Sequence, residues 1–231
     1  GKNVLLLDID PQANATSGVG LEKKEGASAY GPLLGEGLLA EKIQKTAFDR
    51  LSIIPSEVDL CGAELELART ENHLMRVRDA LEPMRASGQF EVIVIDCAPS
   101  LGILTLNAFA ATDRLLVPLQ CEFFALEGLS QLLQTVEQVR ATLNPTLSIH
   151  GVVLTMFDSR NNLSNQVVAD VRQFMGKKVY ETMIPRNVRI SEAPSHGKPV
   201  LVYDLKCAGS EAYLKLATEV IQRERELRTA H

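Results

Sequence analysis

Long apolar runs, paired cysteines and a surplus of basic residues are all missing from this sequence of 231 residues. Its longest apolar runs, such as Val4–Leu7 and Val92–Ile95, fall far short of the roughly 20 residues that a membrane-spanning helix needs. The four cysteines never form the C-x-x-C spacing of a zinc site or disulfide motif, and the four histidines do not cluster. The net charge of −5 excludes a general basic coat for nucleic acids but leaves room for a local basic patch.

These absences favour a cytoplasmic protein whose thiols are reduced and mostly packed, and they argue against metal catalysis through histidine or cysteine ligands. Apolar residues make up 45% of the chain, which is enough to bury a full-sized core and excludes disorder. No repeat, low-complexity stretch or flexible linker divides the sequence. We therefore expect a single domain over residues 1–231.

Short apolar runs alternate with longer segments of helical periodicity, which is typical of a parallel sheet covered by crossover helices. The predicted strands are Val4–Asp8, Leu51–Ile54, Glu91–Asp96, Arg114–Pro118, Ile149–Met156 and Val179–Ile184. The predicted helices cover residues 62–85, 102–111, 125–143, 162–176 and 210–228, the last with Ser210 as its N-cap. Over Gly26–Gly37 we expect turns around at most a short helix. The predicted fold class is α/β, a mostly parallel sheet with helices on both faces.

Acidic residues stand where two of the predicted strands end. Asp8 and Asp10 are two positions apart at the end of the first strand, and Asp96 ends the strand that precedes Pro99 and Ser100. Because ligands bind at the carboxyl ends of strands in an open α/β sheet, these acids point to a hard cation such as Mg²⁺ and a phosphate ester. Two alternatives stay open, since an Asp-x-Asp pair often only caps a turn and many strands end in aspartate.

Longer blocks make the sequence recognisable. They are L-L-L-D-I-D-P-Q-A-N-A-T-S-G at 5–18, P-S-E-V-D-L-C-G-A-E-L-E-L at 55–67, V-I-D-C-A-P-S-L-G-I-L-T-L-N-A at 94–108, V-P-L-Q-C-E-F-F-A-L-E-G-L-S-Q-L-L at 117–133, L-T-M-F-D-S-R at 154–160 and I-P-R-N-V-R-I-S-E-A-P-S-H-G-K-P-V at 184–200. On these blocks the chain resembles the ParA/Soj family of chromosome- and plasmid-partitioning ATPases, a deviant-Walker branch of the P-loop proteins. The resemblance implies a P-loop NTPase-like fold.

The resemblance also implies hydrolysis of ATP with Mg²⁺ as cofactor. Asp10 matches the carboxylate that positions the attacking water, Asp8 is its strand partner near the metal, and Asp96 matches the Walker B acid. Both Asp8 and Asp96 would act on Mg²⁺ mostly through water. The resemblance further implies nucleotide contacts from Pro99, Thr155, Met156, Asp158, Pro185 and Asn187.

A basic cluster near the last helix consists of Arg186, Arg189, Lys198 and Lys206. In the family such residues contact DNA phosphates without sequence preference, whereas the alternative here is solvated surface charge. Relatives often carry an arginine close to the last helix, where this chain reads K-C-A-G-S at 206–210, and His196 is expected to be structural or exposed. The resemblance implies a nucleotide-dependent homodimer on the nucleoid in the cytoplasm, a ParB-type centromere-binding partner and no membrane.

One family motif has no counterpart in these 231 residues. The family begins with a strand and a K-G-G-V-G-K-T-T loop, and no segment here fits G-x-x-x-x-G-K-[ST]. We expect that an N-terminal piece is missing, that neighbouring strand edges are unpaired, and that these residues alone do not hydrolyse ATP.

Two alternatives to a partitioning ATPase follow from the sequence. If the chain truly starts at Gly1, it would be a catalytically inactive module that binds a partner or DNA. A membrane-cycling positioning ATPase resembling MinD is disfavoured, because the tail Q-R-E-R-E-L-R-T-A-H has no bulky apolar face.

Overall fold

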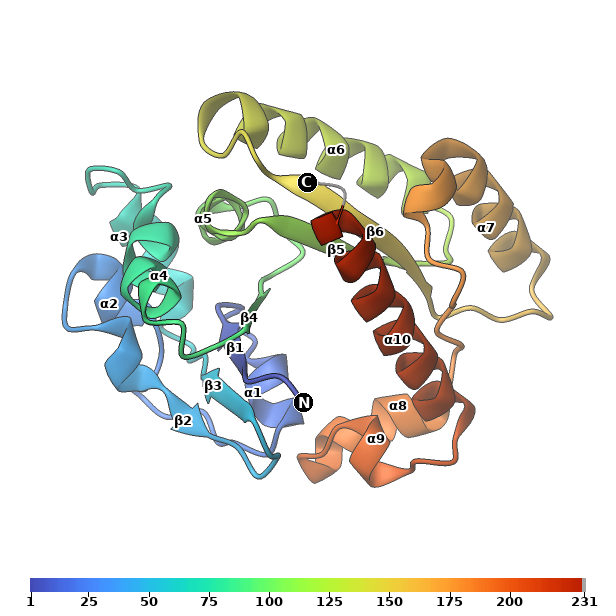
Figure 1. Ribbon diagram of the computed structural model, residues 1–231, viewed down its shortest axis with the longest axis horizontal. Coiled ribbons are helices and arrows are strands. Elements are labelled where there is room, and N and C mark those ends of the chain that lie inside the picture. Colours follow the sequence, from blue (N-terminus) through green and yellow to red (C-terminus); the bar gives the residue numbers. More distant parts are fainter. Residues whose placement is uncertain (230–231) are drawn as a thin grey trace. The chain divides into compact units, whose positions relative to one another are not determined.

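Strand β1 (Val4–Asp8) lies at the centre of a small, mostly parallel sheet in the computed structural model, which describes residues 1–229. Strands β3 (Leu51–Ile54) and β4 (Val92–Asp96) flank it in parallel, and the short β2 (Gln44–Lys45) pairs antiparallel with β3. The strand order is therefore β2-β3-β1-β4 (Figure 1). Alternate residues of a strand face opposite sides, and accordingly Leu5 and Leu7 are fully buried while Leu6 between them is only half-buried.

The chain forms two compact units. The first contains Gly1–Thr112, Gln138–Thr146 and Pro194–Lys198, and the second contains Asp113–Glu137, Leu147–Ala193 and the chain from Pro199 onward. The expectation of a single domain stays a prediction.

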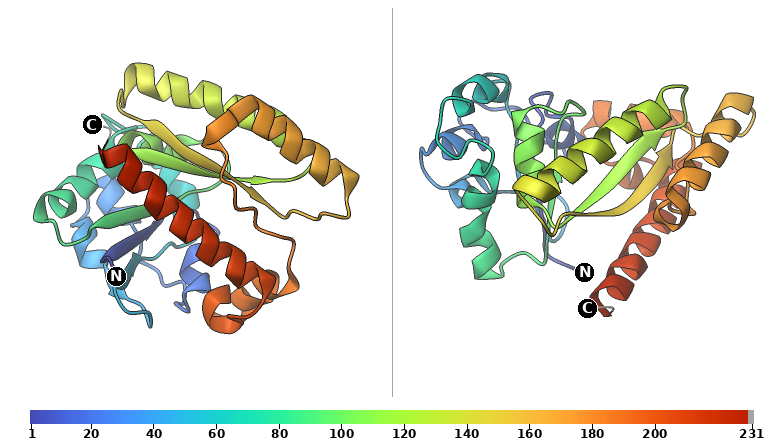
Figure 2. Two further views of the ribbon diagram at one scale, coloured as in Figure 1. Left: turned by 45° about the vertical axis from the view of Figure 1, so that its right-hand side comes forward. Right: turned by 90° about the horizontal axis from the view of Figure 1, so that it is seen from above.

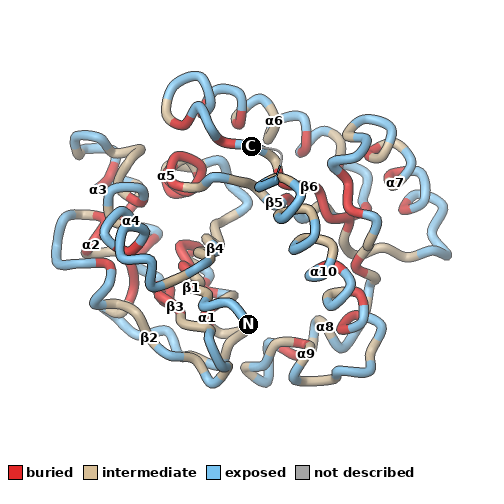
Figure 3. The backbone as a smooth tube through the Cα atoms, viewed as in Figure 1, coloured by how far each residue is buried: buried red, intermediate tan, exposed pale blue. Residues whose placement is uncertain are grey.

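Short helices surround the sheet of the first unit. They are α1 (Asn14–Gly18), α2 (Tyr30–Leu34), the 3₁₀ turn η1 (Leu39–Lys42), α3 (Leu60–Leu67), α4 (Arg76–Ser87) and α5 (Ile103–Ala111). Their apolar residues Leu60, Leu67, Leu81 and Leu104 are buried. Figure 3 shows a buried stretch in red on helix α5. Helix α2 confirms the short helix predicted within Gly26–Gly37.

The single helix predicted over residues 62–85 is wrong, because a turn separates α3 from α4. Asn72 in this turn has a φ of 55°, a left-handed conformation that ends helical geometry. The fully buried Asn107 of α5 holds the turn, since its amide donates to the carbonyl of His73 (2.7 Å) and its oxygen accepts from the N–H of Val77 (3.2 Å). The periodicity of residues 62–85 is helical, but a residue outside this segment determines the break.

Strands β5 (Arg114–Gln120) and β6 (Ser148–Thr155) form the parallel sheet of the second unit. Successive residues of β6 face different helices. Val152 and Leu154 pack with residues of α6 (Ala125–Thr142) and α7 (Asn162–Met175), whereas Val153 packs with α10 (Ala208–Thr229). Figure 2 shows α10 on one side of these strands and the two other helices opposite. The prediction of helices on both faces is confirmed for this sheet.

Smaller elements complete the second half of the chain. They are η2 (Gly176–Lys178), α8 (Val188–Glu192), η3 (Ala193–His196) and α9 (Val200–Tyr203). No helix within residues 1–229 is both long enough and apolar enough to cross a membrane.

The strand predicted over Val179–Ile184 is wrong. Only single bridges reach β6 here, with Tyr180 donating to the carbonyl of Val152 and Ile184 to that of Leu154. Between them, the N–H groups of Glu181 and Thr182 donate to the carboxylate of Glu219 on α10 (2.7 and 3.1 Å). Because this side chain takes the backbone donors, no continuous ladder forms.

Ser210 is not the N-cap of the last helix. It lies inside α10, fully buried, and its hydroxyl donates to the carbonyl of Asp204 (2.6 Å). The sulfur of Cys207, just before the helix, accepts instead from the N–H of Ser210 (3.4 Å). The cap was therefore predicted three residues too late.

Two apolar strands are less buried than their sequences predict. Within the described part of the chain, β4 pairs only with β1 and β5 only with β6, so each has one open edge. Val94 on β4 is 46% exposed and Leu116 on β5 is 43% exposed.

All four cysteines are free thiols, but Cys61 is exposed, so the prediction that most are packed holds fully only for Cys121.

A polar network, which we call the His150 cluster, lies where β6 begins. It consists of His150, Tyr180, Glu224, Arg114 and Arg223. The pairing register places one extra residue, His150, between Ile149 and Gly151, which is a β-bulge. The ring of His150 contacts the Tyr180 hydroxyl through Nδ1 and Glu224 through Nε2 (3.4 Å).

Arginines complete the His150 cluster. Arg114 is ion-paired with Glu224, and the guanidinium of Arg223 lies 4.0 Å from the centre of the Tyr180 ring. Burial lowers the pKa of His150 below its usual range and raises the pKa of Tyr180 to about 12. Both groups are therefore neutral near pH 7, and a His150 proton on Nε2 satisfies both of its contacts.

Candidate functional site

The two acid-tipped strands predicted from the sequence end side by side in the first unit. Asp8 of β1 pairs in register with Asp96 of β4, and Asp10 follows two residues after β1. Parallel neighbouring strands end at the same edge, so three carboxylates gather there. We call Asp8, Asp10 and Asp96 the acid cluster.

Asp8 is fully buried and organises the loop that follows it. Its carboxylate accepts hydrogen bonds from the N–H of Asp10 (3.2 Å) and from the N–H and hydroxyl of Thr16 (2.8 and 2.7 Å). Burial raises the pKa of Asp8, although the bonds from Thr16 act in the opposite direction. The contacts of Asp8 are thus those of a residue that caps a turn. The bond from the N–H of Asp10 also fixes the backbone position of Asp10.

Asp10 has one carboxylate oxygen engaged and one available. It is 8% exposed, and its Oδ1 accepts from the N–H of Gln12 (2.9 Å). Its Oδ2 has no hydrogen-bond partner among the residues that the structure describes. The backbone then turns through Ala13, whose φ of 54° is unusual for alanine. An available carboxylate oxygen is what the orientation of a water molecule requires.

Asp96 is half-buried, and no side chain or backbone donor within residues 1–229 binds its carboxylate. Burial, followed by the charges of Asp8 and Asp10, raises the pKa of Asp96 to about 6. A cation nearby would favour the charged form of this acid. No three His, Cys, Asp or Glu side chains in the described chain are placed to hold a metal ion directly. The half-buried carboxylate of Asp96, beside Asp8 and Asp10, would suit a hydrated Mg²⁺, since Mg²⁺ usually keeps several of its waters.

The segment after Asp96 turns away from the strand. Pro99 is exposed in this turn, and the hydroxyl of Thr105 donates to the carbonyl of Ala98 (3.1 Å). Burial, together with the neighbouring charge of Asp96, raises the pKa of Cys97 to about 11. Cys97 is consequently a protonated thiol and not a nucleophile.

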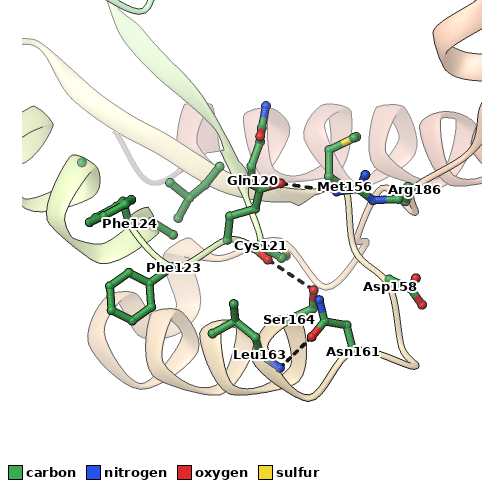
Figure 4. A pocket seen from close by; sticks show the side chains of 14 residues that line it. Gln120, Cys121, Phe123, Phe124, Met156, Asp158, Asn161, Leu163, Ser164 and Arg186 are labelled. Atoms are coloured by element: carbon green, nitrogen blue, oxygen red, sulfur yellow. Dashed lines mark hydrogen bonds and ion pairs between the residues drawn. The ribbon is translucent and has the colours of Figure 1, made fainter.

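Most of the predicted nucleotide-binding residues of the second unit border two neighbouring hollows. Met156 and Asp158 line a hollow of about 810 Å³ with Cys121, Ser164 and the exposed Phe123–Phe124 pair, seen in Figure 4. Asp158 and Pro185 line another of about 380 Å³. A bridge between Phe157 and Pro185 brings the two segments together.

Three of the predicted nucleotide-binding residues either lie outside the hollows or have side chains engaged in other contacts. Thr155 ends β6 and lines neither hollow. The side chain of Asn187 caps α8 by accepting from the N–H of Arg189 (2.9 Å). Arg160 binds both oxygens of Asp158 (2.9 and 2.8 Å), and these bonds hold the pKa of Asp158 at about 2. Any nucleotide contact from these three residues would therefore come from the backbone or from atoms that remain free.

The predicted DNA-binding residues are exposed, but the arginines are not isolated charges. Arg186 forms an ion pair with Glu122 (3.3 Å), and Arg189 forms ion pairs with Glu192 (2.9 Å) and Asp204 (3.5 Å). Lys206 is exposed in the second unit, while Lys198 and the exposed His196 belong to the first. Arg186, Arg189 and Lys206 thus belong to the same unit. Acidic neighbours partly balance the positive charge of both arginines.

Comparison with known proteins gives the family. A family model described as an AAA domain matches residues 1–149. The chromosome partitioning protein ParA of Caulobacter vibrioides is 56% identical over 227 residues, which cover 98% of this chain and 85% of that protein. The sporulation initiation inhibitor protein Soj of Bacillus subtilis is 50% identical over 221 residues, 95% of this chain and 87% of that protein. The chain belongs to the ParA/Soj family.

This ParA/Soj chain also resembles a solved enzyme structure. Cobyrinic acid a,c-diamide synthase from Mycobacterium smegmatis, with a bound ATP analogue and magnesium, aligns with a TM-score of 0.72 at 34% identity, over 85% of this chain and 79% of that one. The identity to the two partitioning proteins is far higher. The resemblance, the fold class and the function of a DNA-partitioning ATPase are therefore confirmed, and this function is favoured over both alternatives.

Sequence reasoning missed several residues of the site. Thr16, Ser56 and Glu57 lie inside the blocks shared with the family, yet only the fold shows what they bind. Thr16 donates to Asp8 and Ser56 to the carbonyl of Asp10, whereas Glu57 accepts from the N–H of Gly26. Arg160, whose side chain is 88% exposed, lines the smaller hollow with Arg186. Its spacing of two residues from Asp158 was the only local signal, and such a spacing is common.

Proposed function

We propose that this ParA/Soj ATPase hydrolyses ATP with the acid cluster as the water- and metal-binding side of its site. The observation that carries the proposal is the pairing of Asp8 with Asp96 at adjacent strand ends, beside Asp10 with its available Oδ2. Asp10 orients the attacking water. Asp96, together with its strand neighbour Asp8, would hold the water molecules of a hydrated Mg²⁺, which would supply charge stabilisation to the phosphates.

We further propose that the two hollows of the second unit receive the adenosine part of ATP. Met156, Asp158 and Pro185 line them, and Thr155 and Asn187 would contribute through the backbone. An ATP analogue and magnesium are bound in the similar M. smegmatis structure, which supports this choice of ligand.

We also propose the assembly in which the ATPase acts. ATP binding promotes a homodimer, and the dimer binds DNA without sequence preference through Arg186, Arg189, Lys198 and Lys206. Doubling the patch offsets the net charge of −5 of a single subunit. A ParB-type centromere-binding protein stimulates hydrolysis, and the cycle takes place on the nucleoid in the cytoplasm. The names of the similar ParA and Soj proteins support this assignment.

Replacing Asp10 tests the catalytic part of the proposal. Asp10→Asn keeps an oxygen that accepts from the N–H of Gln12 but removes the negative charge, so the loop is preserved. In the natural protein we expect turnover to fall by about 10²-fold or more while nucleotide-dependent dimerisation persists, because water orientation matters in the transition state. Asp49→Asn, at a side chain that is 94% exposed, is the matched control. Normal turnover of Asp10→Asn would refute the role of Asp10.

A further inference from the structure

The loop that carries Asp10 is fastened to two parallel strands by buried side chains. On the side of β1, the Thr16 hydroxyl donates to Asp8 (2.7 Å). Two residues beyond β3, the N–H of Ser56 donates to Oγ1 of Thr16 (2.9 Å), and the hydroxyl of Ser56 donates to the carbonyl of Asp10 (2.6 Å). Thr16 and Ser56 are 0% and 1% exposed. The bonds form a closed chain from Asp8 through Thr16 and Ser56 to Asp10.

We propose that Thr16 and Ser56 are positioning residues, which fix the backbone of Asp10 and thereby the direction of its carboxylate. The inference rests on the proposed role of Asp10 in orienting water. Strands β1 and β3 are joined along their length, so a loop bonded to both of their ends cannot shift without breaking a buried bond. A displacement of about 1 Å at a reacting group can cost on the order of 10²-fold in rate.

The local sequence does not hold this loop in place. Ala13 adopts a left-handed conformation, which alanine disfavours, and its N–H donates to the carbonyl of Asp10 (2.8 Å). A strained turn of this kind persists only where surrounding contacts determine it. Ser56 donates to the carbonyl of Asp10 and Thr16 to the carboxylate of Asp8, and both side chains are buried. The hydrogen bond from Lys23 to the carbonyl of Gln12, by contrast, comes from an exposed side chain.

The Ser56 hydroxyl is not needed to satisfy a buried acceptor. The carbonyl of Asp10 still accepts from the N–H of Ala13 when Ser56 becomes alanine. Ser56→Ala should therefore fold, and its effect should lie in the placement of Asp10. Thr16→Val is harsher, because it leaves the buried N–H of Ser56 without its acceptor. Thr16→Ser keeps the hydroxyl and is the conservative variant.

The experiment measures kcat for ATP hydrolysis and the Kd for ATP with Mg²⁺ in the natural protein without DNA. For Ser56→Ala we expect kcat to fall about tenfold and Kd to change less than about twofold, since the residue acts in the transition state only. Thr16→Ser should stay close to the parent. The control is Ser210→Ala, a buried serine that also donates to a backbone carbonyl (2.6 Å) but belongs to the second unit.

A double variant separates positioning from a general structural effect. If Ser56 acts through Asp10, adding Ser56→Ala to Asp10→Asn leaves the residual turnover unchanged. The proposal is overturned if Ser56→Ala turns over within about twofold of the parent while Asp10→Asn is impaired, or if Ser210→Ala loses as much as Ser56→Ala. Normal turnover of Asp10→Asn would instead refute the catalytic role on which the inference rests.

Discussion

Replacing Gly151 with alanine tests the packing of the His150 cluster. A Cβ at this position would lie 2.5 Å from Nη1 of Arg223 and 2.5 Å from Cε2 of Tyr180, closer than Cβ atoms come to other atoms in folded proteins. Tyr180 is fully buried and cannot swing into solvent. Arg223 is also held, because it donates to the carbonyls of His150 (3.1 Å) and Lys178 (3.0 Å). One of these groups has to move.

Two costs set the size of the effect. Forcing an extra carbon into a packed region typically costs about 1–3 kcal/mol. Displacing the guanidinium of Arg223 adds the loss of a hydrogen bond from a charged donor, about 1.5–3 kcal/mol. Because the structure can relax partly, we expect the free energy of unfolding to fall by about 2–4 kcal/mol. For a chain of this length that corresponds to a Tm lower by about 10 °C.

The measurement is urea unfolding followed by circular dichroism, with thermal unfolding as a second probe. Gly128→Ala on helix α6 is the matched control, since a Cβ at this position would have no neighbouring atom within 4 Å. Alanine is the better helix former, so this control should gain about 0.5–1 kcal/mol. Equal stabilities of Gly151→Ala and Gly128→Ala would refute the close packing around Gly151.

Three shorter predictions concern protonation, DNA and a buried amide. Burial lowers the pKa of His150, so the unfolded chain binds a proton at this residue more readily, and the free energy of unfolding should fall as the pH drops from about 7.5 to about 5.5. In paired urea titrations, His150→Gln should make this decline less steep. Arg189→Ala should lower the magnitude of the slope of log K against log salt in gel shifts by about 0.9 per lost phosphate contact, and an unchanged slope and affinity would remove Arg189 from the DNA surface. Glu192→Gln, which removes one of the two acids paired with Arg189, should strengthen binding. Asn107→Ala should cost about 2–3 kcal/mol in urea unfolding because it leaves a buried N–H unpaired, and an equal loss in the exposed Asn165→Ala would contradict this account.

Local patterns in the sequence determined most of the elements. The apolar runs of β1 and β3 were predicted with the bounds that the structure shows, and four helices were predicted to within about two residues. The ends of β1 and β4, which carry Asp8 and Asp96, lie side by side because neighbouring parallel strands end at the same edge of a sheet. The pattern of apolar runs that end in aspartate was enough to predict this arrangement. The sequence blocks shared with the ParA/Soj family indicated the function, because such blocks are recognised along the chain without knowledge of its fold.

Tertiary structure decided what depends on partners distant in the sequence. Asn107 holds the turn that precedes a helix some 30 positions before it, Glu219 takes the donors of a predicted strand, and Ser56 reaches the carbonyl of Asp10 across 46 positions. Each is a polar side chain that satisfies a backbone group which the local pattern had assigned elsewhere or not considered. A buried polar group has to find a partner, and which partner it finds depends on the packing of the whole unit.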